Sequence, residues 1–315
     1  MGSRDFDAEL GAFRPELLRH CYRMLGSFAE AEDLVQEVLL RAWRSRASYA
    51  GDAPLVHWLM RIATNACLTA LSQRRRRELP QLDHEPVDAG TPPQELPSSQ
   101  WITPAPDARL FPSPAAVIET RESVAIAFVA LLQRLPPKQR AVLLLKDVVG
   151  WSADEIATAL DLTVSSVNSA LHRARETIAG HPPARADEPP PEVLHAYVRS
   201  WEDRDVDSLI ALLRRDVVFA MPPRSLWLRG ASTVEAFVRM PRFSAFWSRR
   251  RHVEVTRANG LPALAMYVGD PDGVLRSHSL QVVRFVEGQV AETTAFIGDA
   301  YLHGFDLDRT VSATP

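Results

Sequence analysis

The sequence has few cysteines and no cluster of metal ligands. Its 315 residues include two cysteines, Cys21 and Cys67, and each lies in an apolar helical pattern without the set of cysteine and histidine partners that a zinc site needs. A zinc site or a disulfide framework needs such neighbours, so both thiols are expected to be buried and reduced. Neither a metal nor a cofactor is predicted.

Long apolar runs are missing as well. No stretch of eighteen or more apolar residues occurs, and the first residues lack the basic-then-apolar order of a signal peptide. These absences predict a cytoplasmic protein that does not bind a membrane. The net charge of -3 excludes a uniformly basic nucleic-acid-binding protein but leaves room for local basic patches, such as Arg74–Arg77.

Proline is the residue that the sequence has in abundance. Most of the prolines outside the helical patterns fall in residues 80–114 and 181–191. Proline lacks the amide hydrogen that a helix needs and favours an extended chain. The first cluster also carries several acidic residues, so residues 80–114 are predicted to form an acidic linker between folded blocks. A chain of this length suits two or three domains of about 100 to 150 residues.

Three folded blocks remain, with different periodicities. Residues 6–79 and 115–180 place apolar residues at helical spacing, which predicts two all-α domains. Residues 188–310 begin in the same way and then turn to strand-like runs, which predicts an α+β domain. The strand-like runs are Val217–Met221, His252–Thr256, Leu264–Val268, His278–Phe285 and Gln289–Phe296. Gly273 and Glu287–Gly288 are predicted to form hairpin turns between the later runs.

The second helical block contains a pattern typical of a helix-turn-helix. Ser152 and Glu155 form a capping box, a turn follows, and Thr163 or Ser165 can cap a second helix. Val164, Val167, Leu171 and Ile178 are expected to face inward on that helix. The polar face could enter the DNA major groove. A plain helical hairpin with a polar outer face fits the spacing equally well.

Two groups of motifs resemble the sigma factors of the extracytoplasmic-function (ECF) type. Residues 32–43 read EDLVQEVLLRAW, and residues 58–65 read WLMRIATN before a polyarginine end; both resemble region two of that family. Residues 136–140, PPKQR, together with the helix-turn-helix, resemble region four. The two blocks occur in the order and at the separation of the family and cover roughly the first 180 residues.

The resemblance implies roles for individual residues. One helical face would dock on the clamp helices of the largest subunit of core RNA polymerase, with region four near the flap. A second set would capture an extruded base of the minus-ten element, and a third would read the minus-thirty-five element. The first set is Asp33, Leu34, Gln36, Glu37 and Arg41; the second is Tyr49, Trp58, Asn65, Arg74, Arg75 and Arg76; the third is Ser165, Ser166, Asn168, Ser169, His172 and Arg173. Relatives often carry arginines where Asn168 and Ala170 stand, so the minus-thirty-five sequence is not transferable.

The linker and the third block also resemble family features. The acidic linker is similar to the segment that family members thread toward the polymerase cleft, although a flexible spacer would have the same composition. Within it, Trp101–Asp107 could anchor the linker to a domain, such as the third. Residues from about 188 to 308 resemble the cone-shaped SnoaL-like fold.

That fold usually has an apolar pocket, and Asp216, Trp227 and His278 are expected to line it. An enzyme would use Asp216, His252, His278 or Asp299 for acid-base work, but no two of them have a spacing that implies catalytic geometry. The chain is therefore predicted not to be an enzyme.

The sequence thus predicts a sigma factor that binds core polymerase and promoter DNA and is modulated in cis by its third domain, with an unidentified small ligand as a further partner. The alternative is a ligand-responsive helix-turn-helix regulator that acts without polymerase. The clamp-binding face argues against this alternative, because such a regulator has no use for it.

Overall fold

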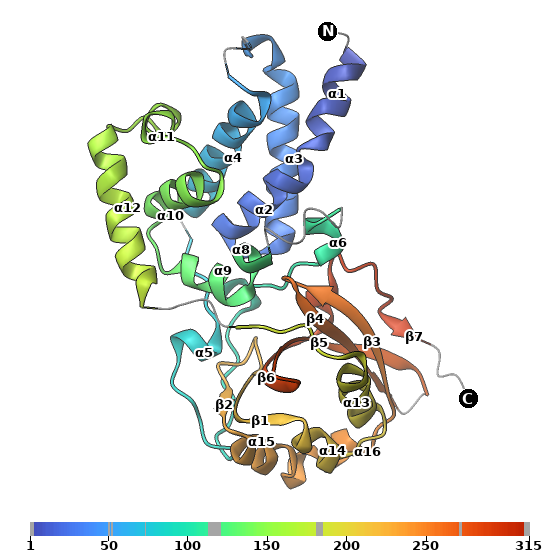
Figure 1. Cartoon of the computed structure of the whole chain (residues 1–315). Coiled ribbons are helices and arrows are strands. Elements are labelled where there is room, and N and C mark those ends of the chain that lie inside the picture. The colour runs from blue at the N-terminus through green and yellow to red at the C-terminus, as the bar shows by residue number, and fades with distance from the viewer. Residues whose placement is uncertain are drawn as a thin grey trace. The chain divides into compact units, whose positions relative to one another are not determined.

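The computed structural model describes residues 3–49, 51, 53–72, 74–112, 121–180, 185–270 and 273–311 (Figure 1). The chain forms two compact units. The first contains residues 1–77 and 109–183, and the second contains residues 78–108 and 184–315. The predicted linker is thus divided between them, with most of it in the second unit. Residues 113–120, where the second helical block was predicted to begin, lie outside the described residues.

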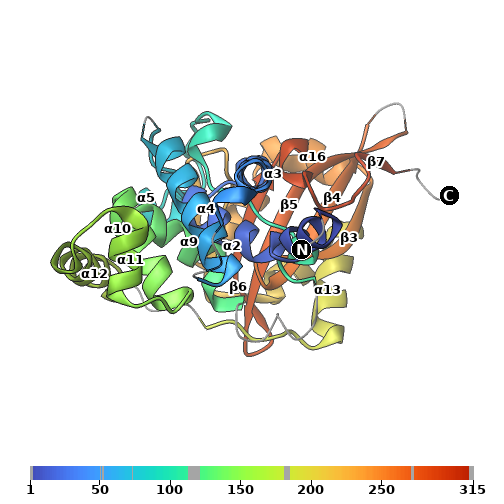
Figure 2. The same cartoon turned by 90° about the horizontal axis from the view of Figure 1, so that it is seen from above.

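The first unit begins with a helical bundle, in which α2, α3 and α4 pack on one another (Figure 2). Gly26 ends α2 in the left-handed conformation, with φ of 69°, and Ser27 caps α3 by accepting from the amide of Glu30. Cys21 and Cys67 are fully buried and free, as predicted. The elements are α1 (Ser3–Ala12), α2 (Arg14–Leu25), α3 (Phe28–Arg44), η1 (Arg46–Ser48) and α4 (Leu55–Leu71).

The remaining helices of the first unit form the helix-turn-helix block. Its α10 packs on α12, and the block meets the bundle through α9 against α2 and α11 against α4. The buried guanidinium of Arg140 joins the two parts by donating to the carbonyl oxygens of Met24, Gln133 and Leu135. The elements are α8 (Arg121–Val124), α9 (Ile126–Gln133), α10 (Pro137–Leu143), η3 (Leu144–Val148), α11 (Ala153–Leu160) and α12 (Val164–Ala179).

The second unit is built on a twisted sheet with the strand order β2-β1-β6-β5-β4-β3, and β7 pairs with β5. Neighbouring strands are antiparallel except β1 and β6, which run parallel. The five predicted strand-like runs correspond to β1, β3, β4, β5 and β6, whereas β2 and β7 were not expected. The strands are β1 (Leu213–Ala220), β2 (Trp227–Arg229), β3 (Arg251–Ala258), β4 (Leu261–Gly269), β5 (Leu275–Val286), β6 (Gln289–Ile297) and β7 (Thr310–Val311).

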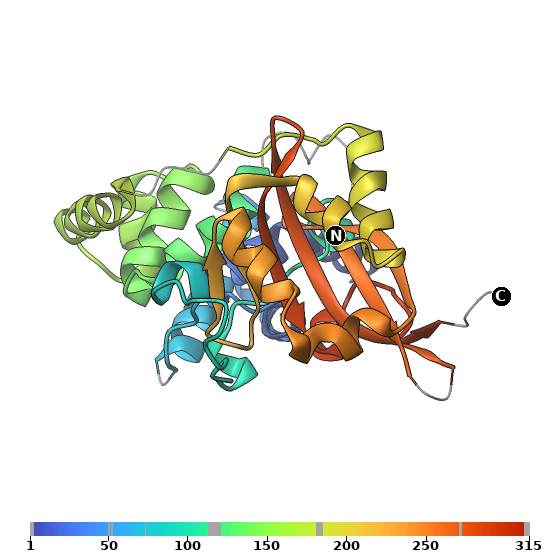
Figure 3. The same cartoon turned by 90° about the horizontal axis from the view of Figure 1, so that it is seen from below.

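Helices cover one face of this sheet (Figure 3). The core lies between them and the strands, where Tyr197, Trp201 and Phe237 meet Val253 and Phe285. The predicted hairpin turn at Glu287–Gly288 is confirmed, with positive φ at both residues. The helices are α13 (Pro191–Glu202), α14 (Val206–Ala211), α15 (Ala231–Val238), η4 (Pro241–Phe243), α16 (Ser244–Ser248) and η5 (Asp299–Leu302).

Residues 78–108 fold as part of the second unit, with short helices α5 (Pro80–Asp83) and η2 (Ser98–Gln100) before α6 (Asp107–Leu110). A parallel bridge between Glu78 and Trp101 closes this segment on itself, and Trp101 is fully buried. The main-chain N–H of Asn259 donates to the carbonyl of Ala105 at 3.0 Å, and the Asp107 carboxylate accepts from Gly260 N at 2.8 Å. The Trp101–Asp107 segment therefore anchors to the third domain, as expected.

Candidate polymerase and promoter interfaces

One face of α3 carries the residues predicted to bind polymerase. Asp33, Gln36, Glu37 and Arg41 are exposed, and Leu34 is half-buried. Glu37 and Arg41 form an ion pair one turn apart. The opposite face, which includes Val35 and Val38, is fully buried in the bundle. The helix therefore presents one polar stripe and one core stripe.

Sequence reasoning missed two apolar residues on this exposed side of α3. Leu40 is 56% exposed and Trp43 is 41% exposed. Leu40 follows Asp33 and Gln36 at helical spacing, so the same periodicity that selected those residues would have found it. An exposed apolar side chain within a charged stripe is a feature of protein-binding surfaces, because its burial provides affinity that the rim charges do not.

The residues predicted to handle the minus-ten element gather at the start and along one side of α4. The rings of Tyr49 and Trp58 lie 5.4 Å apart, and the Tyr49 hydroxyl donates to the carbonyl of Ala53 at 2.8 Å. Asn65 is exposed two turns beyond Trp58 on the same helix, and exposed Arg61 lies between them. The half-buried Tyr49 and Trp58 rings thus form an aromatic pair on the same side of the bundle as the exposed Asn65 amide.

The arginines that follow α4 have two different environments. Arg75 and Arg76 are exposed. Arg74 pairs with Glu30, and Arg77 is buried with its Nη2 at 2.8 Å from the same carboxylate. Arg77 therefore holds the end of the bundle to α3, while Arg75 and Arg76 remain on the surface, where they could contact phosphates.

The helix-turn-helix has the predicted caps. Ser152 and Glu155 form the complete capping box, and these hydrogen bonds are the main reason why the pKa of Glu155 is lowered. Asp161 forms the turn in the left-handed conformation with φ of 54°, and Thr163 caps α12. All six residues predicted to read the minus-thirty-five element are exposed on α12: Ser165, Ser166, Asn168, Ser169, His172 and Arg173.

Two expectations for α12 were wrong. Val164 was predicted to face inward but is 37% exposed, because it is the first residue of the helix and has no preceding turn to cover it. Ala170 was treated as a position comparable to DNA-contacting arginines, yet it is buried with Val167 and Ala174 on the core side. A position on that side packs the helix and does not reach DNA.

A contact between α4 and the start of α11 joins the two reading surfaces of the first unit. The imidazole of His57 lies 4.8 Å from the Trp151 ring, and its Nδ1 lies 3.6 Å from Glu155 Oε1. His57 directly precedes Trp58 of the Tyr49–Trp58 aromatic pair. The minus-ten and minus-thirty-five candidates therefore belong to one packed body.

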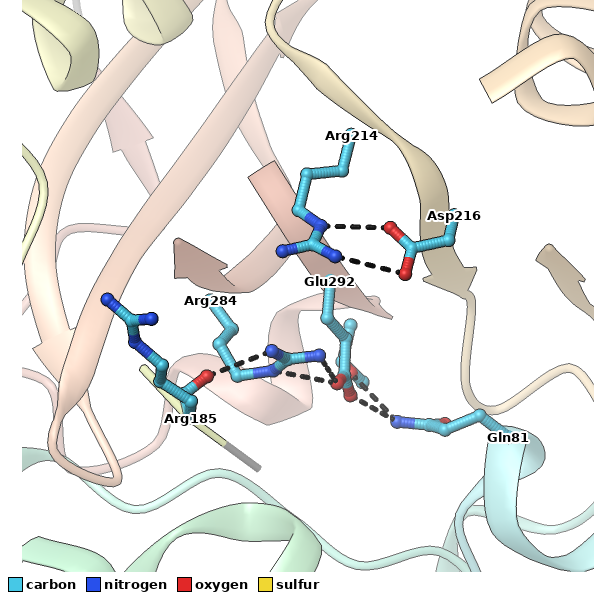
Figure 4. Close-up of polar contacts among 7 residues, drawn as sticks. Gln81, Arg185, Arg214, Asp216, Arg284 and Glu292 are labelled. Atoms are coloured by element: carbon cyan, nitrogen blue, oxygen red, sulfur yellow. Dashed lines mark hydrogen bonds and ion pairs between the residues drawn. The ribbon is translucent and has the colours of Figure 1, made fainter. Parts of the chain in front are cut away.

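In the second unit, a polar cluster fixes the segment 78–108 to the sheet (Figure 4). Gln81 Nε2 donates to Glu292 Oε1 at 2.9 Å and to Thr294 Oγ1 at 3.2 Å. The other Glu292 oxygen accepts two hydrogen bonds from Arg284, its cross-strand partner on β5. Nothing in the spacing of these residues indicates that Gln81 meets strands more than 200 residues later, so the cluster was missed.

The three residues predicted to line a pocket lie in different environments. Asp216 is exposed and forms two hydrogen bonds with Arg214, which lower the pKa of its carboxyl (Figure 4). Trp227 is buried, and its Nε1 donates to the carbonyl of His84 at 2.8 Å. His278 is half-buried, and burial is the main reason why its pKa falls to about 4. Two grooves in the described part of the second unit are not lined by any of these three residues.

Family comparisons agree with both helical blocks. The Sigma-70 region 2 family matches residues 10–77, and the Sigma-70, region 4 family matches residues 125–178. These matches define the class of protein as an RNA polymerase sigma factor, which binds core polymerase and promoter DNA and has its role in transcription initiation rather than in catalysis. The alternative of a regulator that acts without polymerase is not favoured.

The relatives make the class narrower. The chain is 40% identical over 314 residues to the ECF RNA polymerase sigma factor SigG of Mycobacterium tuberculosis. The alignment covers 96% of this chain and 84% of that protein. The chain is 28% identical over 241 residues to SigJ of the same organism, covering 73% of this chain and 71% of that protein. The chain therefore belongs to the ECF RNA polymerase sigma factors.

A solved structure supports the fold of the whole chain. The crystal structure of Mycobacterium tuberculosis SigJ matches with a TM-score of 0.60 and 23% identity, covering 96% of this chain and 99% of that one. The fold class is thus two all-α sigma domains and a C-terminal α+β domain of the SnoaL-like type, as predicted. Among the described residues, no helix is long and apolar enough to span a membrane.

Proposed function

We propose that this sigma factor is restrained in cis by its C-terminal domain, which holds the segment 78–108 as part of its own fold. The supporting observation is the membership of this segment in the second unit, where Trp227 and Glu292 bind it through His84 and Gln81. The same segment joins the minus-ten and minus-thirty-five blocks in the sequence. A segment that is held in this way cannot extend to let the blocks separate.

The distance between promoter elements supports the restraint. Sites at minus ten and minus thirty-five are about 25 base pairs apart, which is about 85 Å of duplex at about 34 Å per turn. A compact unit of about 150 residues has a radius of gyration of about 15 Å. The contact of His57 with Trp151 and Glu155 keeps the two reading surfaces in one such unit. We infer that they separate when both elements are read, so release of the segment 78–108 is a step toward activity.

The residues for each interface follow from exposure and chemistry. The α3 face with Asp33, Gln36 and Glu37 docks on the clamp helices of polymerase, and its acidic groups suit a basic partner surface. Tyr49, Trp58 and Asn65 receive an unstacked base, for which aromatic rings and an amide are suitable groups. The exposed face of α12 enters the major groove, and region four contacts the flap. This activity belongs in the cytoplasm, where polymerase works.

Runoff transcription with core polymerase tests both parts of the proposal, using DNA from upstream of the gene for this protein as the promoter. Asp33→Ala and Asn65→Ala should each reduce the transcript at least tenfold. The double variant Gln81→Ala with Trp227→Phe removes two anchors of the segment 78–108 and should raise the transcript at limiting protein. Asp216→Asn is the matched control, because Asp216 is exposed on the same domain and pairs with Arg214, a residue outside the segment 78–108. If the double variant gave the same amount of transcript as Asp216→Asn, the proposed restraint would be wrong, but the sigma activity would be unaffected.

A further inference from the structure

A buried arginine in the C-terminal domain lacks partners for two of its nitrogens. Arg251, the first residue of β3, is 8% exposed. Its Nη2 donates to the carbonyl of Phe246 at 2.6 Å, but Nε and Nη1 are covered and have no hydrogen-bond partner. Among the described residues, Arg251 forms no ion pair. Arginine is seldom buried without an anion, because the loss of hydration is otherwise uncompensated.

Aromatic stacking does not satisfy these nitrogens. The guanidinium carbon lies 4.4 Å from the ring centroid of Phe246 and 4.5 Å from that of Trp247. Such contacts attract the cation to the faces of the rings. The N–H groups, however, lie in the plane of the guanidinium and need acceptors at its edge. The donors on Nε and Nη1 therefore stay unsatisfied among the described residues.

A β-bulge brings a histidine to the same aromatic residue. Met266 pairs with Ser279 and Tyr267 pairs with Ser277, so His278 is the extra residue on β5. Its ring lies 5.2 Å from that of Phe246, which packs against the core of the domain. Nδ1 of His278 is buried and has no hydrogen-bond partner. A bulge redirects one side chain of a strand, and here it adds a third unsatisfied nitrogen beside the Phe246 ring.

The charged groups that act on Arg251 and His278 are positive. Burial and the charges of Arg224, Arg249 and Arg251 lower the pKa of His278 to about 4, so the imidazole is neutral at pH 7. Burial and the charges of Arg204 and Arg249 likewise lower the pKa of Arg251 to about 10. The acidic partners of Arg224 and Arg249, which are Glu95 and Asp270, do not pair with Arg251. The cluster therefore carries an uncompensated positive charge.

We propose that Arg251 and His278 bind the carboxylate of a small organic acid, whose apolar part packs beside Phe246 and Trp247. Nε and Nη1 lie on different edges of the guanidinium and can each donate one hydrogen bond to a carboxylate oxygen, and the neutral imidazole can supply a further hydrogen bond. A single charge with an apolar body suits the aromatic surroundings better than a doubly charged phosphate, which would lose more hydration. Arg249, whose charge acts on both Arg251 and His278, lines a groove of about 450 Å³ next to β4 and β5.

This inference names the class of ligand for the regulation proposed above, but its test does not use polymerase. Benzoate is titrated into the full chain by calorimetry, with benzamide as the uncharged match. Benzoate should bind with a millimolar or lower dissociation constant, and benzamide at least tenfold more weakly. Failure of the sigma activity would not affect this result, and failure of binding would leave the sigma activity standing.

Variants assign the binding to the cluster. Arg251→Met should weaken benzoate binding at least tenfold, whereas Arg250→Met, which removes the same charge from the exposed neighbouring residue, should leave it within twofold. His278→Phe keeps the buried cation and should weaken binding about threefold to tenfold, as expected for the loss of one hydrogen bond. If Arg251→Met does not fold, His278→Phe still tests the proposal. Equal affinity for benzoate and benzamide, no binding of benzoate at 10 mM, or full affinity in a folded Arg251 or His278 variant would each overturn the proposal.

Discussion

The indole Nε1 of Trp227 donates a hydrogen bond of 2.8 Å to the main-chain carbonyl of His84. Trp227 begins β2 in the C-terminal domain, and His84 directly follows α5 in the segment between the two sigma regions. Two more hydrogen bonds continue the contact, from Val87 N to the carbonyl of Trp227 and from Leu96 N to that of Pro223. The domain thus holds this segment through its backbone as well as through the Gln81 side chain.

Trp227→Phe should loosen the first part of this segment. The variant keeps an aromatic ring in the core and removes one hydrogen bond, which contributes about 1 kcal/mol, so local opening should become about fivefold more frequent. Hydrogen exchange of the Val87 amide measures this change. The Asn259 amide, bonded to Ala105 at the other end of the segment, is the internal control and should keep its rate. Equal acceleration at both amides would indicate general destabilisation.

Arg140→Met should destabilise the first unit strongly. The buried guanidinium, whose pKa burial lowers to about 10 and which is therefore charged at pH 7, bonds to three carbonyl oxygens and to Gln133 Oε1. Methionine fills the space but leaves these acceptors unsatisfied, so a loss of about 3 to 5 kcal/mol in the free energy of unfolding is expected. Urea denaturation followed by circular dichroism measures the loss.

Arg175→Met is the control for this experiment. Arg175 is exposed and pairs with Asp147 through a surface ion pair, which contributes at most about 1 kcal/mol. A similar loss of stability in both variants would show that the Arg140 network has no special role.

Leu40→Ala should weaken binding to core polymerase. The side chain is exposed on the α3 face and contributes nothing to the core, so the variant should fold normally. If Leu40 is buried by polymerase, its truncation should cost about 1 to 2 kcal/mol, which is roughly a fivefold to thirtyfold rise in the dissociation constant. Fluorescence anisotropy of the labelled protein measures it. Val255→Ala, which truncates a residue 50% exposed on β3, should bind as the unchanged protein does.

His20 should make the first unit less stable in acid. Its imidazole is fully buried with Nε2 at 2.9 Å from Thr64 Oγ1, and burial is the main reason why its pKa falls to about 3. Below pH 6.5 the His20 imidazole binds a proton in the unfolded chain but not in the folded chain, so stability falls as the pH drops from about 6.5 toward 3. The slope approaches about 1.4 kcal/mol per pH unit.

Urea unfolding between pH 7.5 and 5 tests the role of His20. In His20→Gln this part of the slope should disappear, while an amide can still bond to Thr64. The same pH dependence in both proteins would assign the acid sensitivity to other groups.

Several features were predictable because they depend on neighbours in the sequence. The capping box at Ser152, the exposed stripe of α3 and the hairpin at Glu287–Gly288 each follow from residues a few positions apart. The motifs at residues 32–43 and 58–65 and the PPKQR motif with the helix-turn-helix also indicated the family, because the two blocks occur in its order along the chain. The inward assignment of Val164 failed for a local reason as well, since helical periodicity does not say where the first covered turn begins.

The sequence by itself therefore determined the helical blocks, the strand-rich third domain and the class of protein. Only the tertiary structure decided that residues 78–108 fold with the third domain, that Gln81 meets Glu292, and that Arg251 and His278 pack against the same Phe246 ring. The physical reason is the same in each case. Proline-rich composition makes a segment extended but does not say which surface it binds, and a bulge that redirects a side chain depends on strand pairing between distant residues.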